Sequence, residues 1–477
     1  MRYFALALPL IMACTAPRVS HPELGVSTPE EWAGLIQTSS DSKWWNNFND
    51  PVLDALIEEA QGNNHNLKAA ATRVRAAAAQ AKIAGAPLQP QVSGRLGASR
   101  RKQNFIGFPI PGGSNGVASS TSSNFGVSLD VSWELDLWGR LGAVKSAALS
   151  DFQAARADHS GARLSLAGQT AKAWFAAIEA HRQKELAEAT VQNFTTSSEL
   201  VRTRYQRGLR PSLDLRLSLS ILSNAEANLA QRGLLLDRST RQLEILLGRY
   251  PGAQLDVASD LPEIPSQVPG EIPANLVSRR PDLVAAERRV AAALARTKQA
   301  KRSLYPRISL SSSAGTSSSD LNHLLNGDYS VWNLAANLIQ PMLQGGRIRG
   351  SIEFARAKDQ QSLALYVQTA LNAFAEVESA LSAEGYLESR EASLVVATEQ
   401  SLAARRLAEE RYASGLSDLI TLLDAQRRAY ESESQLLAVR RQRLENRIDL
   451  HLALGGGYRG VSMEQVDAQN NHGAEAQ

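Results

Sequence analysis

The sequence contains one long unit twice, and this duplication limits the folds that are open to the chain. Asn66-Leu67 is matched by Asp282-Leu283 at a spacing of 216 residues. Further along, the spacing falls to 207 residues and stays there, for Gly139-Arg140 with Gly346-Arg347, Tyr205 with Tyr412, Gly208-Leu209 with Gly415-Leu416, and Leu247-Gly248 with Leu454-Gly455. Solenoid repeats are typically only about 20–50 residues long. The chain is therefore expected to carry two copies of a large structural unit.

Composition and charge exclude several classes of function. The chain has 477 residues, of which 43% are hydrophobic and 21% are charged, and its net charge is +3. A charge this small, spread over this length, gives no basic patch, so nucleic acid is not an expected partner. The histidines are scattered, and no nucleophile or phosphate-binding motif is present. The sequence therefore predicts no metal, no cofactor and no enzyme activity.

The N-terminus resembles a bacterial lipoprotein signal. A positive start at Arg2 and an apolar stretch lead to the run Ile11-Met12-Ala13-Cys14. Cleavage before Cys14 would leave this residue with acyl chains on its amine and its thiol, and several chains anchor a protein more firmly than one. Cys14 is the only cysteine, so no disulfide competes for it. An ordinary secretory signal with an unmodified cysteine is the alternative. The resemblance to such lipoproteins also implies that Thr15, in place of an aspartate, favours transfer to the outer membrane.

Each unit contains a pair of amphipathic strands. Between Phe125 and Leu137, apolar residues alternate strictly with polar ones. Strands of globular domains usually have about 5–6 residues, whereas a longer alternation suits a strand with lipid on one face and water on the other. We expect β-hairpins at about 92–137 and about 306–341, the second with a turn at Asn326-Gly327-Asp328.

Four strands of this kind require more than one chain. After the N-terminal signal there is no run of 18 apolar residues, so a membrane crossing would use strands. Bacterial barrels start at about eight strands, and open strand edges are not viable in lipid. Several chains must therefore pool their strands, and three chains would give twelve.

Long helices make up the larger part of each unit. From Leu141 to about Arg207, and from Gln344 to about Ser414, the chain contains no proline. At a rise of about 1.5 Å per residue, each stretch predicts a rod of about 100 Å. Each rod should end at a glycine turn and fold back into a helix of about 35 residues. The helix from Val52 to about Ala86, with a break at Gly62-Asn63-Asn64, could stack end to end with the first return helix.

The expected organisation follows from these elements. The return helices carry leucines at a heptad spacing, which predicts ordinary helix packing, and the run Arg440-Arg441-Gln442-Arg443 is expected to face solvent. The expected segments are a signal peptide (1–13), a lipid-anchored segment (14–50), a first repeat (51–248, helical hairpin about 140–248), a Pro-rich connector (249–281), a second repeat (282–457, helical hairpin about 344–455) and a disordered tail (458–477).

Three motifs resemble those of the outer-membrane efflux proteins of the TolC/OprM/NodT kind. They are Asn49-Asp50-Pro51-Val52-Leu53, the run from Ser132 to Arg140 (SWELDLWGR), and the run from Thr421 to Arg427 (TLLDAQR). The resemblance spans about Trp44 to Gly457. It implies a membrane β-barrel with a long α-helical barrel: a homotrimer with a 12-stranded barrel in the outer membrane and a 12-helix tunnel in the periplasm.

The resemblance also implies a function and partners. The expected function is the exit duct of a tripartite efflux pump for drugs or other small molecules, working with a periplasmic adaptor protein and an inner-membrane transporter of the RND type, in contact with outer-membrane lipid. A duct for type I protein secretion is one alternative. A lipid-anchored structural coiled coil without a pore is another, which would need the rods but not the hairpins.

Candidate gate residues lie near the predicted hairpin tips. Gly208 and Gly415 are the tip turns. In the resembled family, acidic rings line the periplasmic aperture, and the matching positions here are Thr421 and Asp424. The alternative for Asp424 is a solvated carboxylate stabilised by the helix dipole. Asp214 and Tyr412 could form a hydrogen bond that holds the closed state, while the basic residue that some members place two after the glycine is Ser417 here.

Overall fold

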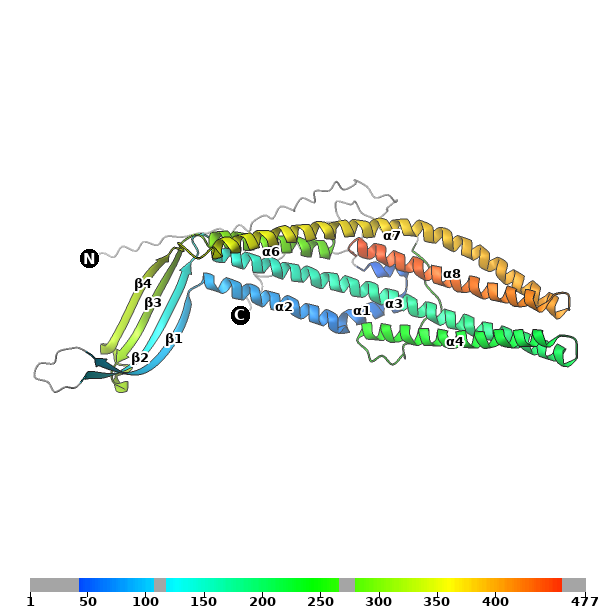
Figure 1. Ribbon diagram of the computed structural model, residues 1–477, viewed down its shortest axis with the longest axis horizontal. Coiled ribbons are helices and arrows are strands. Elements are labelled where there is room, and N and C mark those ends of the chain that lie inside the picture. Colours follow the sequence, from blue (N-terminus) through cyan, green and yellow to red (C-terminus); the bar gives the residue numbers. More distant parts are fainter. Residues whose placement is uncertain (1–42, 107–116, 266–278, 457–477) are drawn as a thin grey trace, which may run out of the picture.

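The computed structural model describes residues 43–106, 117–265 and 279–456. The chain forms a long rod of helices with a curved sheet at one end (Figure 1). Cys14, the tail 458–477 and part of the connector lie outside the described residues. Among the helices that are described, none is both long and apolar enough to cross a membrane.

The two units have the same order of elements. The first begins with a short 3-10 helix and continues as α1, α2, β1, β2, α3 and α4; the second runs α6, β3, β4, α7 and α8. The bounds in the first unit are η1 Trp44–Phe48, α1 Pro51–Asn63, α2 His65–Gly85, η2 Ala86–Leu88, β1 Gln91–Phe105, β2 Ala118–Leu135, α3 Arg140–Gln206 and α4 Ser212–Leu247. Those in the second are α6 Pro281–Arg302, β3 Arg307–Ser318, η3 Leu321–His323, η4 Gly327–Tyr329, β4 Ser330–Ile339, α7 Arg347–Ala413 and α8 Leu419–Ala453.

The four strands form one antiparallel sheet in the order β1-β2-β3-β4. Gln91 is opposite Ser132, and Leu135 is opposite Ile308 in the pairing that joins the two units. The predicted hairpins are both present, although β2 begins earlier than the alternation indicated. Strands β1 and β4 have no neighbour on their outer edges among the described residues of the chain.

The helices form a layer of long rods with half-length partners. Figure 1 shows α2 and α4 end to end along α3, and α6 and α8 end to end between α3 and α7. Asn64 forms the joint between α1 and α2: its side-chain oxygen accepts the Leu67 N–H at 3.1 Å, and its amide donates to the Leu246 carbonyl at 3.0 Å. The predicted break and the end-to-end stacking with α4 therefore come from one capping residue.

The largest apolar cluster lies at mid-length, where η1 and α1 meet α3. Trp44, Phe48 and Trp174 are each at most 2% exposed. Asp50 lies between η1 and α1. It caps α1 by accepting the Val52 N–H at 2.9 Å, and it also accepts the Trp174 indole N–H at 2.7 Å. Residues 44–50 are thus fixed to the middle of the rod, well away from the sheet.

The first part of the connector is also fixed to the rod. Leu255 and Leu261 pack against the mid-length cluster. The buried carboxylate of Glu244 on α4 accepts the backbone N–H groups of Ala253 and Gln254, both at 2.7 Å. Buried backbone donors need such partners, so Glu244 determines where the chain leaves the first unit.

Candidate functional site

The run from Ser132 to Arg140 forms the junction between strand β2 and helix α3. Asp136 accepts the N–H groups of Leu141 at 2.9 Å and Gly142 at 2.6 Å, which are free at the first turn of a helix. Gly139 has φ +74°, a conformation that suits glycine, and its carbonyl accepts a hydrogen bond from Arg302 at 2.7 Å. Asp136, one of the two acidic residues of the motif, is therefore a helix cap.

Two tryptophans of the same run connect the junction to its neighbours. Trp138 donates to the Pro306 carbonyl at 2.9 Å and stacks on Tyr305 with ring centroids 5.3 Å apart. Trp133 donates to the Leu88 carbonyl at 3.0 Å. The motif therefore joins the sheet–helix junctions of both units, which gives it a structural role.

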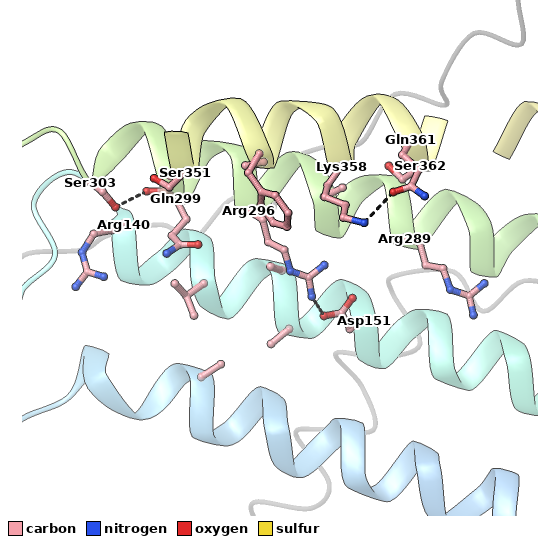
Figure 2. Close-up of a pocket in the computed structure, with 18 of the residues that line it drawn as sticks. Arg140, Asp151, Arg289, Arg296, Gln299, Ser303, Ser351, Lys358, Gln361 and Ser362 are labelled. Carbon is pink, nitrogen blue, oxygen red and sulfur yellow. Dashed lines mark hydrogen bonds and ion pairs between the residues drawn. The ribbon is translucent and has the colours of Figure 1, made fainter. Parts of the chain in front are cut away.

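An open cavity of about 1030 Å³ lies beside this junction, lined by α2, α3, α6, α7 and the start of β3 (Figure 2). Its lining is strongly basic. Six cationic side chains and one carboxylate, that of Asp151, line it; the cations are Arg140, Arg289, Arg296, Arg307, Arg347 and Lys358. No sequence pattern marks this cluster, because its members come from four separate elements.

Half of these cations have acidic partners. Arg140 pairs with Glu134 at 2.6 Å, Arg289 pairs with Asp158, and Arg296 pairs with Asp151. For the other three, no carboxylate of the described residues is a partner. Lys358 donates to the neutral amide oxygen of Gln361 at 3.0 Å, Arg347 donates to that of Gln344, and the remaining cation is Arg307.

The opposite end of the rod carries two equivalent glycine turns. Gly208 and Gly415 follow α3 and α7 with φ +72° and +78°. In the first turn, Leu209 N–H donates to the Arg204 carbonyl at 2.9 Å; in the second, Leu416 N–H donates to the Arg411 carbonyl at 2.8 Å. Such bonds satisfy the last carbonyls of a helix, so the two tips are built alike.

Tyr412 and Asp214 do not form the expected hydrogen bond. The Tyr412 side chain is buried, and its hydroxyl has no hydrogen-bond partner among the described residues. Asp214 lies instead 3.8 Å from Arg210 on its own helical hairpin. Two guanidinium groups flank the Tyr412 ring, that of Arg204 at 4.8 Å and that of Arg210 at 5.6 Å.

Arg204 and Arg210 therefore connect the tips of the two helical hairpins. Arg204 donates to the carbonyls of Tyr412 at 3.0 Å and Ala413 at 2.8 Å, which belong to the open end of α7. Arg210 reaches the Ser417 carbonyl at 3.5 Å. In place of the expected phenol–carboxylate hydrogen bond, the tips are joined by cation–π contacts and by hydrogen bonds to carbonyls. Matched positions in the two units do not predict these contacts.

Asp424 and Thr421 lie in the first turns of α8. Asp418 caps this helix by accepting the Thr421 N–H at 2.7 Å, so Asp424 is not the capping carboxylate. Asp424 accepts hydrogen bonds from Arg428 and Arg427, each at 2.7 Å. Hydrogen bonds from Arg428 and then Arg427 lower the pKa of Asp424. The negative charge of Asp424 is therefore paired with two arginines on the same helix.

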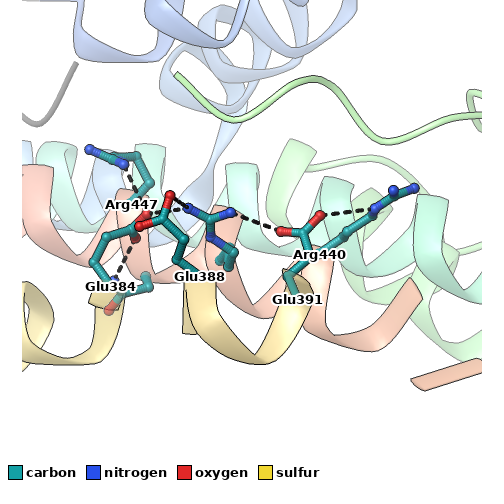
Figure 3. A network of polar contacts seen from close by, with 7 residues as sticks. Glu384, Glu388, Glu391, Arg440 and Arg447 are labelled. Atoms are coloured by element: carbon teal, nitrogen blue, oxygen red, sulfur yellow. Dashed lines mark hydrogen bonds and ion pairs between the residues drawn. The ribbon is translucent and has the colours of Figure 1, made fainter. Parts of the chain in front are cut away.

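The arginine run on α8 is partly buried, so the solvent-facing interpretation was wrong for Arg443. This side chain is 13% exposed and binds Glu384 at 2.8 Å and Glu391 at 2.9 Å on α7. Arg447 binds the same Glu384 at 3.1 Å, and burial lowers its pKa. Figure 3 shows the resulting network between α7 and α8. Glutamates at 384, 388 and 391, which lie on one helix face, are the signal that could have revealed it.

The described residues contain no group of three or more His, Cys, Asp and Glu side chains that could hold a metal ion.

The chain was compared with known protein families and structures. A family model described as outer membrane efflux protein matches residues 56–249 and 272–456.

Relatives and solved structures agree with that match over nearly the whole chain. The pyoverdine export outer membrane protein OpmQ of Pseudomonas putida KT2440 is 34% identical over 468 residues, covering 95% of this chain and 96% of the relative. The toluene efflux pump outer membrane protein TtgF, from another strain of P. putida, is 29% identical over 431 residues, covering 90% and 88%. The outer-membrane channel OprN has a TM-score of 0.82 at 28% identity, covering 92% of this chain and 99% of that structure.

Proposed function

This chain belongs to the outer membrane efflux protein family, and we propose that three copies of it form the exit duct of a tripartite efflux pump. The observation that carries the proposal is the open sheet. Strand β1 runs away from the helices and β4 runs back toward them (Figure 1). The free edge of β4 in one copy can therefore pair in antiparallel fashion with β1 of the next, and closure removes every open edge.

The helical layer supports the same assembly. Helix α7 lies at one flank and exposes large apolar side chains, among them Tyr386, Val396 and Leu407. The other flank, formed by α2 and α4, exposes Ile83 and Ile245. Exposed apolar residues on both flanks favour a head-to-tail contact between copies, which closes into a ring.

The proposal extends to partners, anchoring and cargo. An outer-membrane duct of an efflux system needs an energy source elsewhere, so we propose a periplasmic adaptor and an inner-membrane transporter of the RND type as partners. Cys14 would carry lipid. Since relatives are named for pyoverdine export and for toluene efflux, we propose small molecules, in preference to a secreted polypeptide, as the cargo.

The gate is proposed to lie at the hairpin tips. Gly208 and Gly415 mark the periplasmic end, and Thr421 and Asp424 would line its aperture when three chains meet. The contacts of Arg204 and Arg210 with Tyr412 would hold the two hairpins of one chain together in the narrow state, with Asp214 positioning Arg210.

Planar bilayers provide the test of the duct. The purified, detergent-solubilised protein should migrate as a trimer and give discrete conductance steps after insertion. A monomer without conductance would contradict the duct and favour the structural coiled coil. In cells, deletion of the gene should increase sensitivity to small toxic molecules; loss of a secreted polypeptide with no such change would favour the secretion alternative.

A further inference from the structure

The basic cavity at the sheet–helix junction opens on the polar face of the sheet. Side chains alternate between the two faces of a strand, so Arg307 shares a face with Ser309 and Ser311, while Ile308 and Leu310 lie on the other. Glu134, which pairs with Arg140 of the cavity, is opposite Ser309 and so lies on the Arg307 face. In a membrane barrel the apolar face contacts lipid and the polar face lines the lumen.

We infer that this cavity is part of a cationic belt in the lumen, just below the barrel, that binds anionic cargo and favours its passage. The inference rests on the proposed trimeric duct. Three cations per chain, Arg307, Arg347 and Lys358, have no carboxylate partner among the described residues. A trimer would therefore present nine such charges around one opening.

The duplication supplies a second observation, because the excess charge comes from the second unit. Arg140 and Arg347 are matched positions, each the first residue of a long helix. Arg140 has Glu134 as its partner, but the residue matched to Glu134 is Pro341. Likewise, Lys358 occupies the position matched to Asp151. At these two matched positions the first unit has carboxylates, whereas the second has a proline and a cation.

The position of the belt gives it influence over transport. Ions and small molecules that leave the helical tunnel must pass it to enter the barrel. Fixed charges on a narrow opening with low-dielectric walls concentrate counter-ions and repel ions of like sign. The expected ligand is a multivalent organic or inorganic anion, because several cations from different helices can contact it together.

The test is the reversal potential of the reconstituted channel in a KCl gradient. The wild-type channel should prefer Cl⁻ to K⁺ by a few-fold at low salt, and the preference should fall near 1 M salt, where the Debye length is about 3 Å. Pyrophosphate, used as a probe, should reduce the conductance of the channel in KCl. Arg307→Gln, Arg347→Gln and Lys358→Gln should each lower the anion preference, and the triple variant should abolish it.

Control variants distinguish an effect of the belt on selectivity from an effect of net charge or of misfolding. Lys298→Gln removes one exposed charge from α6, two residues from Arg296 and so about 200° around the helix; it should leave the selectivity unchanged. Arg347→Lys keeps the charge and should keep the preference. A trimer that conducts but prefers K⁺, or whose selectivity is the same in wild type and triple variant, would overturn the belt while leaving the duct intact. Absence of any conductance in the wild type would contradict the duct itself.

Discussion

The two helical hairpins have nearly the same backbone, but they differ in the seam, the set of side-chain contacts between the long helix and its return helix. Helices α3 and α7 both have 67 residues, and their return helices have 36 and 35. In the second hairpin, the seam contains Glu384, Arg443 and Arg447. The matched residues of the first are Ala177, Leu236 and Thr240. One seam is therefore joined by directional ion pairs and the other by close contact of small and apolar side chains.

The difference shows that a duplicated fold can keep its geometry while its stabilising interactions diverge. Ala177 is fully buried, so the first seam depends on volume. The second depends on charge, because Arg443 and Arg447 are desolvated and need their carboxylates. The first hairpin should be sensitive to added volume and the second to the loss of a charge, which the following substitutions test.

Glu384→Gln should have the largest effect. It removes the carboxylate shared by Arg443 and Arg447, and breaking a buried ion pair costs about 3 kcal/mol or more. The midpoint of thermal unfolding of the purified protein should fall clearly. Glu388→Gln is the control, because this side chain is 69% exposed and lies 3.5 Å from Arg443; its midpoint should stay near the wild-type value. Equal effects of the two variants would contradict the ionic seam.

Ala177→Leu should disturb the first hairpin through volume alone. Overpacking a closely packed site costs about 1–3 kcal/mol. Ala189→Leu, at an exposed position of the same helix, provides the comparison and should be nearly neutral. Chemical unfolding of both variants measures the difference. If Ala177→Leu unfolds like the wild type, the first seam is not closely packed.

The ends of the two return helices differ in the titratable group that they bury, Glu244 in the first and His451 in the second. Burial, and then the charge of Arg447, lower the pKa of His451 to about 4. A base with a lowered pKa in the folded state gives stability that is full above about 6.5 and is lost as the pH falls toward 4. From about pH 7.5 to about pH 5.5 the loss should be about 1 kcal/mol per chain.

The thermal midpoint at several pH values measures this loss. In His451→Gln the slope over that window should decrease, even if the variant is less stable at every pH, since the stacking of His451 on Trp44 is also lost. An unchanged slope would show that other groups set the pH dependence.

Tyr412→Phe should have the smallest effect. The hydroxyl is buried and has no partner among the described residues, so its removal should not lower the stability. Tyr412→Ala should instead raise the conductance, because it removes the ring between Arg204 and Arg210. Conductance records of both variants distinguish two ways of holding the proposed gate. If the ring holds it, only Tyr412→Ala should raise the conductance; if a phenol hydrogen bond holds it, the two variants should behave alike.

The sequence predicted those features that depend on local pattern. The break near Asn64, the strand alternation around Trp133 and the lengths of the rods all follow from residues close together in the chain. It did not predict contacts made by flexible side chains over long separations. Arg443 and Glu384 are 59 residues apart, and Arg204 and Tyr412 are 208 apart. Their pairing depends on how the helices are rotated, which a periodic pattern determines only roughly.

The joints between the half-length helices have a mechanical consequence. Helices α3 and α7 run without interruption, but their companions are divided at one level, where hydrogen bonds from Asn64 to Leu246 and from Arg280 to Ala453 cross the gap. At this level only α3 and α7 are continuous. Torque applied at the tips therefore reaches the sheet through these two helices, because α4 and α8 end at the joints.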